Sequence, residues 1–487
     1  MSSNPPRCMS TQHPDNATLP FFTNNSVLNG DDEVQEAFYA YSDLGIREQL
    51  WDAEGKEIDS HVVKKLLTKY ETFFRKHTLG KDVRLTLRIP NPAVEKNEAK
   101  IAAETLETIP RSFDVAKLFG SDVPPVFEVV LPMTSDAREV LRVHDYYTKI
   151  VVGKREQKIN DVTIKEWIGD FKPDTINVVP LVEDKDSMLN VKNIVLPYLQ
   201  KIKPEQQRVW IARSDPALNY GMLSAVLLNK IAMAELEELQ AETSVEIFPI
   251  IGVGSVPFRG NFSPDNINCL KGYPSVQTFT VQSAFKYDYP AHHVRTAIEA
   301  INSTRRGKAI PVEKKKCLDI VERYSEQYTA DLRRAMPALQ MIVKHIPRRR
   351  ARKLHIGLFG YSRGVGEFQL PRAISFCASL YSIGLPPELF GLSALTSKDF
   401  EYLDSEVYKN FDGDLRSALK FVNVDAIAVL APELGATAGT MLKKFHVEVD
   451  AEHKKATDDV IRALKQDKHA GLHQAIVRAG TIRKFLG

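Results

Sequence analysis

The sequence has few cysteines and no long apolar run, and these absences exclude several classes of protein. Its four cysteines, at positions 8, 269, 317 and 377, lie far apart and form no C-x-x-C pair, so neither a disulfide framework nor a zinc knuckle is indicated. No segment reaches the roughly 18 apolar residues of a membrane-spanning helix, and the first residues contain no charged stretch followed by an apolar run. We therefore expect a cytoplasmic protein with reduced thiols and no membrane partner.

The chain also has little net charge. Lys and Arg total 65 against 62 Asp and Glu, which leaves +3 at neutral pH, too little for a field that would draw the whole protein to nucleic acid. The one sharp charge run, residues 348–353, precedes an expected strand and has no interleaved aromatic residues. We expect it to be a solvated helix end with no nucleic-acid partner. Salt-sensitive binding without turnover would favour the opposite interpretation.

Short apolar, β-rich runs alternate with long helical patterns, which favours a parallel sheet with helical crossovers. Seven strands are expected, with an eighth near residues 390–395 or before Trp51, and this number predicts an α/β fold, a TIM-like (β/α)8 barrel. We expect one domain, residues 1–487, that is helix-rich overall with extensive additional helices, among them amphipathic helices over residues 224–242 and 312–345. The seven expected strands cover residues 83–88, 126–131, 176–182, 209–212, 247–251, 278–281 and 354–359.

Two carboxylates follow successive expected strands and can converge on one cation. Glu183 comes directly after the strand at 176–182, and Asp215 comes shortly after the strand at 209–212, where barrel enzymes carry their reactive side chains. Mg²⁺ suits such a pair, because it takes oxygen ligands, accepts one or two protein carboxylates and leaves its other positions to water and substrate. For a single carboxylate, Glu183 or Asp184, capping of the following helix is the alternative.

Arginines recur at comparable places. Residues 252–261 form a glycine-containing loop that exposes backbone N–H groups and carries Arg259, although its spacing matches neither a Walker loop nor G-x-G-x-x-G. Arg88 closes one expected strand, Arg363 follows the last one, and Arg372 lies shortly beyond. Each alone could be a salt-bridged surface arginine, but their repetition at strand ends indicates a polyanionic ligand.

One motif favours a different chemistry. Residues 360–364 match G-x-S-x-G after an expected strand, the pattern of an α/β-hydrolase nucleophile at Ser362. A nucleophile elbow leads directly into a helix, whereas Gly364, Gly366 and Pro371 keep this segment irregular. The hydrolase is therefore the weaker alternative, and it predicts metal-independent ester cleavage that Ser362→Ala abolishes.

Residues 9–16, Met-Ser-Thr-Gln-His-Pro-Asp-Asn, resemble the opening signature of archaeal-type phosphoenolpyruvate carboxylases and the Thr-Ala-His-Pro-Thr motif of the longer bacterial and plant enzymes. The resemblance covers essentially the whole chain. Further matching segments are residues 51–56, 212–217, 282–286, 354–362 and 483–487.

The resemblance implies that bicarbonate carboxylates phosphoenolpyruvate to oxaloacetate and inorganic phosphate, through carboxyphosphate and a metal-stabilised enolate, a carbon-fixing lyase reaction that feeds the tricarboxylic acid cycle. It also implies Mg²⁺, with Mn²⁺ as the alternative, on Glu183 and Asp215, and a homotetramer. Because imidazole titrates near neutrality, His13 is expected to deprotonate carboxyphosphate from an ordered N-terminal segment. A barrel lyase or aldolase acting on pyruvate or oxaloacetate through a metal enolate is the alternative; it would use the same carboxylates but would need no phosphate site.

Four arginines acquire roles from the resemblance. Arg88 and Arg372 resemble family arginines that hold the phosphate and carboxylate of the substrate. Arg259 matches the second arginine of a glycine-rich loop and is expected both to bind substrate and to act in catalysis. Arg363 resembles the catalytic arginine of a Gly-Ser-Arg-Pro segment.

Two positions depart from the pattern of the longer enzymes. Val253 stands where their glycine-rich loop has its first arginine, and Leu218 stands where the segment after the Ser-Asp pair has a lysine. These departures leave the contacts to bicarbonate and carbon dioxide unassigned.

Overall fold

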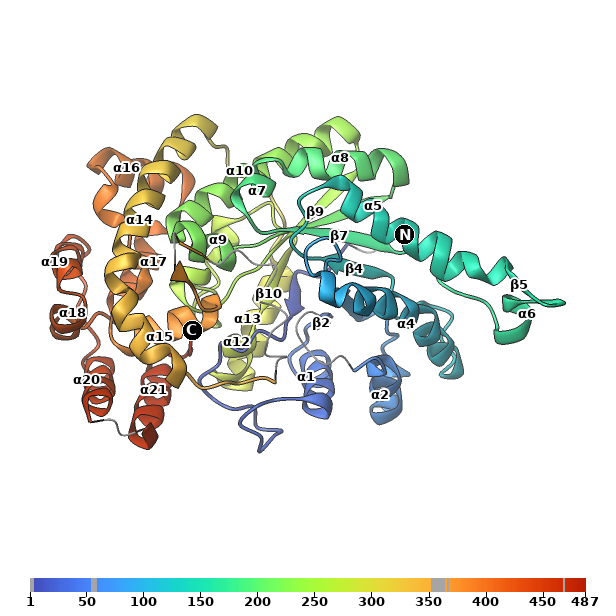
Figure 1. Ribbon diagram of the computed structural model, residues 1–487, viewed down its shortest axis with the longest axis horizontal. Coiled ribbons are helices and arrows are strands. Elements are labelled where there is room, and N and C mark those ends of the chain that lie inside the picture. The colour runs from blue at the N-terminus through green and yellow to red at the C-terminus, as the bar shows by residue number, and fades with distance from the viewer. Residues whose placement is uncertain (1–3, 54–58, 352–363, 366–367, 467–468) are drawn as a thin grey trace.

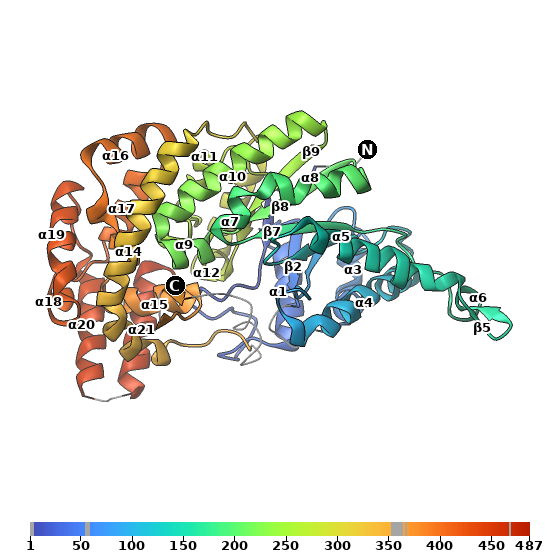
Figure 2. The same ribbon diagram turned by 45° about the horizontal axis from the view of Figure 1, so that its top comes forward.

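A closed barrel of eight parallel strands forms the centre of the computed structural model, which describes residues 4–53, 59–351, 364–365, 368–466 and 469–487. Helices surround the barrel (Figures 1 and 2). The strands lie in the order β1-β10-β9-β8-β7-β4-β3-β2, which confirms the predicted TIM-like barrel. Their bounds are β1 Cys8–Ser10, β2 Glu48–Asp52, β3 Arg84–Arg88, β4 Glu128–Leu131, β7 Asn177–Val182, β8 Gln206–Ile211, β9 Glu246–Ile251 and β10 Thr278–Val281.

Most of the strand predictions are confirmed. Six of the seven predicted strands are barrel strands, because strands buried on both faces give continuous apolar runs. The predicted eighth strand before Trp51 is β2, which contains that residue, whereas the alternative near residues 390–395 is wrong, since Leu392–Ala394 forms a short 3-10 helix. The prediction at 354–359 lies outside the described residues, and the barrel closes without it.

The sequence pattern misses β1, whose three residues are too few to show a strand period. This strand pairs in parallel with β10 through Cys8 and Phe279, and with β2 through Ser10 and Gln49. Beyond it, the backbone N–H of Thr11 donates to Val281 O at 3.0 Å. The N-terminal segment is therefore built into the barrel, as predicted for an ordered segment that carries His13.

Helices make up 57% of the chain, well above the usual third of a globular protein, as predicted. The helices around the barrel are α1 Gly30–Ser42, α2 Val62–Lys69, α3 Glu71–Phe74, α4 Ala99–Leu118, α5 Ala137–Asp145, α6 Ile164–Ile168, α7 Lys185–Leu189, α8 Val191–Ile202, α9 Ser214–Tyr220, α10 Met222–Thr243, α11 Cys269–Gly272, α12 Ser283–Tyr287 and α13 Ala291–Ser303. Those that follow are α14 Lys314–Ile342, α15 Ala373–Ser382, α16 Ser397–Tyr402, α17 Phe411–Leu419, α18 Val424–Leu430, α19 Gly435–Lys444, α20 Ala451–Lys465 and α21 His469–Arg483.

Two apolar cores share helix α10. One core fills and surrounds the barrel, and the other lies among α9, α10 and the helices from α14 onward (Figure 1). The predicted helix at 224–242 is confirmed as α10, but its predicted amphipathic character is wrong, because every residue from Met222 to Met233 is buried between the two cores. The other predicted long helix is α14. A single domain over residues 1–487 stays a prediction.

The amino ends of the strands form a charge-compensated floor. Arg208 on β8 donates to Glu48 Oε1 on β2 and to Glu128 Oε2 on β4, both at 2.7 Å. All three side chains are buried, so their charges must satisfy one another. Among the described residues, no helix is long and apolar enough to cross a membrane.

Candidate active site

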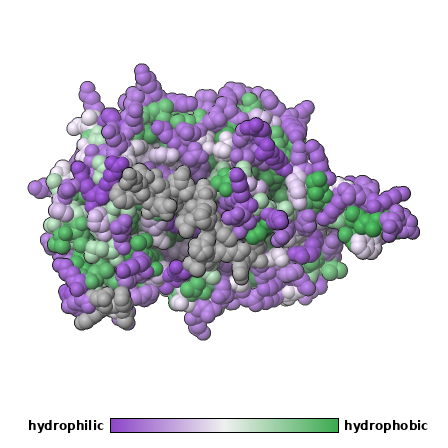
Figure 3. Space-filling view, viewed as in Figure 1, coloured by the Kyte–Doolittle hydropathy of each residue, from purple (hydrophilic) through white to green (hydrophobic). Residues whose placement is uncertain are grey.

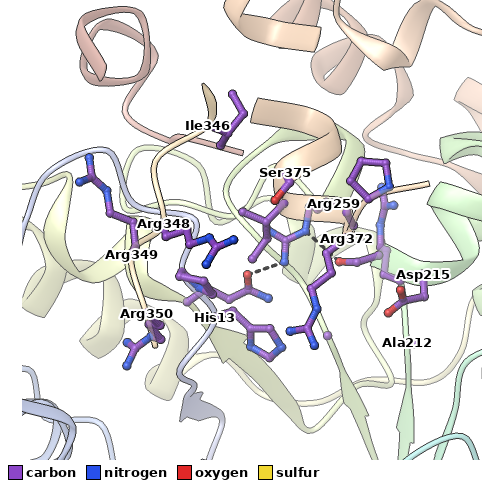
Figure 4. Close-up of a pocket in the computed structure, with 18 of the residues that line it drawn as sticks. His13, Ala212, Asp215, Arg259, Ile346, Arg348, Arg349, Arg350, Arg372 and Ser375 are labelled. Atoms are coloured by element: carbon purple, nitrogen blue, oxygen red, sulfur yellow. Dashed lines mark hydrogen bonds between the residues drawn. The ribbon is translucent and has the colours of Figure 1, made fainter. Parts of the chain in front are cut away.

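A cavity of about 760 Å³ opens at the carboxyl ends of the barrel strands (Figure 4). Because the strands are parallel, the residues that follow them meet at this one end. The lining has far more cationic groups than carboxylates, which suits a polyanionic ligand. Its basic side chains are His13, Arg88, Arg213, Arg259, Lys344, Arg348, Arg349, Arg350 and Arg372, and its carboxylates are Glu183 and Asp215.

The two predicted metal ligands both line this cavity. Glu183 is buried directly after β7, and its Oε2 accepts a hydrogen bond from the backbone N–H of Met133 at 2.9 Å. Asp215 lies in the first turn of α9 after β8. Helix capping belongs instead to Asp184, whose Oδ1 accepts the Ser187 N–H at 2.9 Å. The pair thus offers two hard oxygen ligands and fits a divalent cation that takes its other ligands from water and substrate.

Arg88 reaches the cavity from the end of β3 as half of an ion pair. Asp52 lies opposite it on β2, and the guanidinium donates to both carboxylate oxygens, from Nε at 2.9 Å and from Nη2 at 2.7 Å. Such a bidentate pair fixes the orientation of the guanidinium. Arg88 is therefore held rigidly at the rim.

Arg259 is buried and held by several hydrogen bonds. It is 2% exposed, and it closes the short 3-10 helix Pro257–Arg259 after β9. A side chain at Gly254 would place its Cβ 2.9 Å from the guanidinium, so the glycine is needed for this packing. The guanidinium donates to three oxygens, Ser214 Oγ at 3.0 Å, Gln282 Oε1 at 2.6 Å and Gly487 O at 3.0 Å.

His13 and Arg372 also line the cavity, and the close-up shows both side chains among those that surround it (Figure 4). His13 follows β1, and its Nδ1 lies 2.8 Å from Thr11 Oγ1, which fixes the ring plane. Arg372 directly precedes α15. The structure therefore places six of the seven predicted site residues, Arg259 among them, in one cavity. The seventh, Arg363, lies outside the described residues, as does the hydrolase motif at Ser362.

The basic run is not the solvated helix end that its sequence suggested. Arg349 and Arg350 are 6% and 4% exposed. Arg350 Nη2 donates to Glu36 Oε1 at 2.5 Å, and Arg349 Nη2 donates to Ala17 O at 2.5 Å. The segment also forms a parallel bridge with Leu28. It packs against the N-terminal segment beside the cavity, which local sequence could not reveal, and residues 352–353 lie outside the described part.

The two departures from the family pattern fill core space. Val253 and Leu218 are fully buried, the first in the barrel core and the second in the helical core, and neither is among the described residues that line the cavity. Sequence reasoning missed one lining residue that strand-end placement could have found, Gln282 directly after β10.

Comparison with known sequences decides the family. The sequence model of the phosphoenolpyruvate carboxylase family matches residues 5–487. The chain belongs to this family. It is 50% identical over 485 residues to a phosphoenolpyruvate carboxylase of Methanothermobacter thermautotrophicus, with 99% of each chain covered. The identity is 49% over 485 residues to the Pyrococcus abyssi enzyme, covering 99% and 100% of the two chains, and 45% over 490 residues to the Halobacterium salinarum enzyme, covering 99% of each.

These comparisons confirm the predicted archaeal-type family and the predicted activity, that of a phosphoenolpyruvate carboxylase, a lyase. Members of this family generally use a divalent metal ion. Phosphoenolpyruvate and bicarbonate are the substrates that the family implies. The comparisons therefore favour a carboxylase over the three alternative interpretations of the sequence, a hydrolase, an aldolase and a nucleic-acid-binding module.

Proposed function

We propose that the cavity at the barrel mouth joins phosphoenolpyruvate and bicarbonate in two steps, through carboxyphosphate and the enolate of pyruvate. One observation carries the proposal: two carboxylates, Glu183 and Asp215, stand among many basic side chains in a single cavity. Phosphoenolpyruvate has a phosphate and a carboxylate and needs several cations, whereas a divalent metal ion needs the acidic pair. The product would enter the tricarboxylic acid cycle as oxaloacetate.

The arginines would hold the substrate by charge. Arg88, rigid in its pair with Asp52, and Arg372, which lines the cavity (Figure 4), would bind the phosphate and carboxylate groups. Arg259 would bind the same anion and neutralise the charge that spreads over the transferring phosphoryl group, together with Arg363. Fixed donors are effective in this task because they need no reorientation during the reaction.

Glu183 and Asp215 would hold Mg²⁺, or Mn²⁺ as the alternative. The donor set fits, because both groups are oxygen ligands and the Met133 N–H already orients one of them. When bound, the ion supplies Lewis-acid stabilisation of the negative charge that develops on the enol oxygen.

In the first step, a bicarbonate oxygen would form a bond to phosphorus while the bond from phosphorus to the enol oxygen breaks. His13 would then remove the proton of carboxyphosphate, which separates into carbon dioxide and phosphate. The enolate carbon would attack carbon dioxide and form oxaloacetate. The segment around Arg349 and Arg350, packed on residues 17–36, would help to exclude water from these intermediates.

The direct test is a coupled assay for oxaloacetate with magnesium and bicarbonate each withheld in turn. We expect both omissions to abolish oxaloacetate formation, and we expect phosphate release to depend on bicarbonate, because phosphorus is attacked by bicarbonate and not by water. Phosphate release that continues at the same rate without bicarbonate would contradict the proposed first step.

We propose a homotetramer, and one surface supports contact between copies. An arm made of β5 Lys158–Ile159, β6 Val162–Thr163 and α6 projects from the body (Figures 1 and 2), and apolar residues gather on it (Figure 3). Trp167 and Ile168 there are 65% and 57% exposed. Exposed apolar side chains clustered on one projection are typical of an interface.

Replacing Trp167 with Glu is expected to lower the molar mass in light scattering after gel filtration, because a charge cannot be buried between apolar surfaces. Leu118→Glu is the matched control, since Leu118 is an exposed apolar residue at the end of α4, and it should leave the mass unchanged. If the molar mass of Trp167→Glu is unchanged, the arm does not contribute to the contact between copies.

All four cysteines are buried as free thiols. Burial raises the pKa of Cys8 and of Cys269 to about 12, so both remain protonated and unreactive at neutral pH. Unpaired thiols fit a reducing compartment, and this supports the proposed cytoplasmic location.

A further inference from the structure

The backbone of the residue directly before Arg259 forms hydrogen bonds with two buried charged side chains. The N–H of Phe258 donates to Glu388 Oε1 at 2.5 Å, and the carbonyl oxygen of Phe258 accepts from Arg213 Nη1 at 3.1 Å. Phe258 is fully buried, and Glu388 and Arg213 are each 1% exposed. One residue is therefore held from both ends by opposite charges.

The two gripping residues come from different parts of the fold. Arg213 follows β8 at the barrel mouth, whereas Glu388 lies in the 3-10 helix Pro387–Leu389, after α15. Phe258 itself belongs to the short helix after β9 that ends at Arg259. The grip thus fixes the loop of Arg259 between the barrel and the helices of the second core.

A carboxylate at the position of Glu388 costs more free energy than a purely structural contact would require. Tyr381 OH donates to the same Oε1 at 2.8 Å, while Oε2 is buried and accepts no hydrogen bond from the described residues. Glu388 also has no ion pair within the described part of the chain. Burial raises the pKa of this carboxyl to about 7, and a buried carboxylate without a cation beside it is costly to maintain. A glutamine could accept the same two hydrogen bonds without that cost, so the charge itself needs an explanation.

We propose that Glu388 and Arg213 are positioning residues for the carboxylation, which clamp Phe258 and thereby set the place of the Arg259 guanidinium. This inference rests on the proposed function of Arg259. An ionised carboxylate holds an N–H more strongly than a neutral acceptor does, and small displacements of a catalytic group are costly in rate. The clamp therefore acts on the reaction only through Arg259.

The clamp makes the rate depend on the charge of Glu388. With its pKa raised to about 7, the carboxyl is ionised above neutral pH and accepts a strong hydrogen bond from the Phe258 N–H. As the pH falls it becomes protonated, and this hydrogen bond weakens. The ionisable groups whose charges act on it are Tyr324 on α14, Cys377 and Tyr381 on α15, and Asp414 on α17. Arg213 lies on the other side of Phe258, where it donates to the carbonyl oxygen of that residue.

The first test compares Glu388→Gln with the wild-type enzyme across pH. Glutamine stands in for the protonated carboxyl, so kcat should fall about tenfold at alkaline pH, and the two enzymes should converge as the pH falls below neutrality. The KM for phosphoenolpyruvate should rise at alkaline pH as well, because Arg259 is also proposed to bind the substrate. Asp331→Asn is the matched control, because Asp331 is a buried carboxylate on α14 that contacts the Gly391 N–H, not the loop, and its kcat should stay at the wild-type value.

Two further variants keep the outcome decisive. Tyr381→Phe removes one hydrogen bond from the Glu388 carboxylate and should shift the acid limb of kcat to higher pH; this variant decides the matter if Glu388→Gln does not fold. Arg259→Gln tests the proposed function itself and should lower kcat by about a hundredfold. If Arg259→Gln is fully active, the proposed role of Arg259 is wrong; if it is impaired while Glu388→Gln and Tyr381→Phe keep the wild-type pH profile, only the clamp is wrong.

Discussion

Asp215→Asn is expected to lower oxaloacetate formation by about a thousandfold at saturating phosphoenolpyruvate. The amide keeps the size of the side chain but removes one of two anionic ligands from the proposed cation site, so the enolate loses its main charge stabilisation. Glu183→Gln should behave in the same way. Steady-state kinetics over a range of magnesium concentrations, with Mn²⁺ binding followed by electron paramagnetic resonance, measures both the rate and the affinity for the metal ion.

Asp184→Asn is the control for this experiment. Asp184 stands next to Glu183 but caps α7 through the Ser187 N–H, so its replacement should lower the melting temperature slightly and leave Mn²⁺ binding unchanged. Unaltered Mn²⁺ binding in both Asp215→Asn and Glu183→Gln would show that the cation lies elsewhere. If activity is lost while Mn²⁺ binding stays complete, the two carboxylates contribute to substrate binding and do not hold the metal ion.

The two ends of the barrel use charge in opposite ways. At the floor, Arg208 is matched by Glu48 and Glu128, so the buried charges cancel and stabilise the strand arrangement. At the mouth, the basic side chains that line the cavity outnumber the carboxylates there, even though Arg88 is paired with Asp52 and Arg350 with Glu36. This excess opposes folding in the empty enzyme and is relieved when a polyanion binds, which is the expected electrostatics of a substrate site and not of a structural core.

The strands and the position of Glu183 and Asp215 at the barrel mouth could be predicted because they depend on local pattern. Runs such as β7 are apolar throughout, and the residue after such a run must lie at the barrel mouth, which places Glu183 without any knowledge of tertiary contacts. The same reasoning could have found Gln282. It failed for β1, where three residues carry no period and the strand exists only because β10 and β2 supply its hydrogen bonds.

Features that depend on long-range contacts could not be predicted. Arg349 and Arg350 look like surface charges in sequence, yet Glu36 and the carbonyl of Ala17, more than 300 residues away, bury and pair them. Glu388 lies 130 residues from Phe258, and nothing around it marks it as a partner of the Arg259 loop. Such contacts are set by the packing of α14 to α21 on the barrel, which no local period encodes.

His13→Asn is expected to separate the two halves of the reaction. Oxaloacetate formation should fall by about a thousandfold, because asparagine cannot accept the proton of carboxyphosphate. Bicarbonate-dependent phosphate release should continue, because water hydrolyses the accumulated carboxyphosphate to phosphate and bicarbonate. The enolate that finds no carbon dioxide takes a proton and leaves as pyruvate. Parallel assays of phosphate, pyruvate and oxaloacetate on one sample measure this partition directly.

The position of the ring offers a graded control. Thr11→Val removes the hydroxyl 2.8 Å from His13 Nδ1 without changing the imidazole, so it should shift the partition toward pyruvate by a smaller factor. If His13→Asn forms oxaloacetate at the wild-type rate, the proposed base is wrong. If it loses phosphate release and oxaloacetate equally, His13 acts at or before the attack on phosphorus, because a base needed only for carboxyphosphate cannot slow a step that precedes its formation.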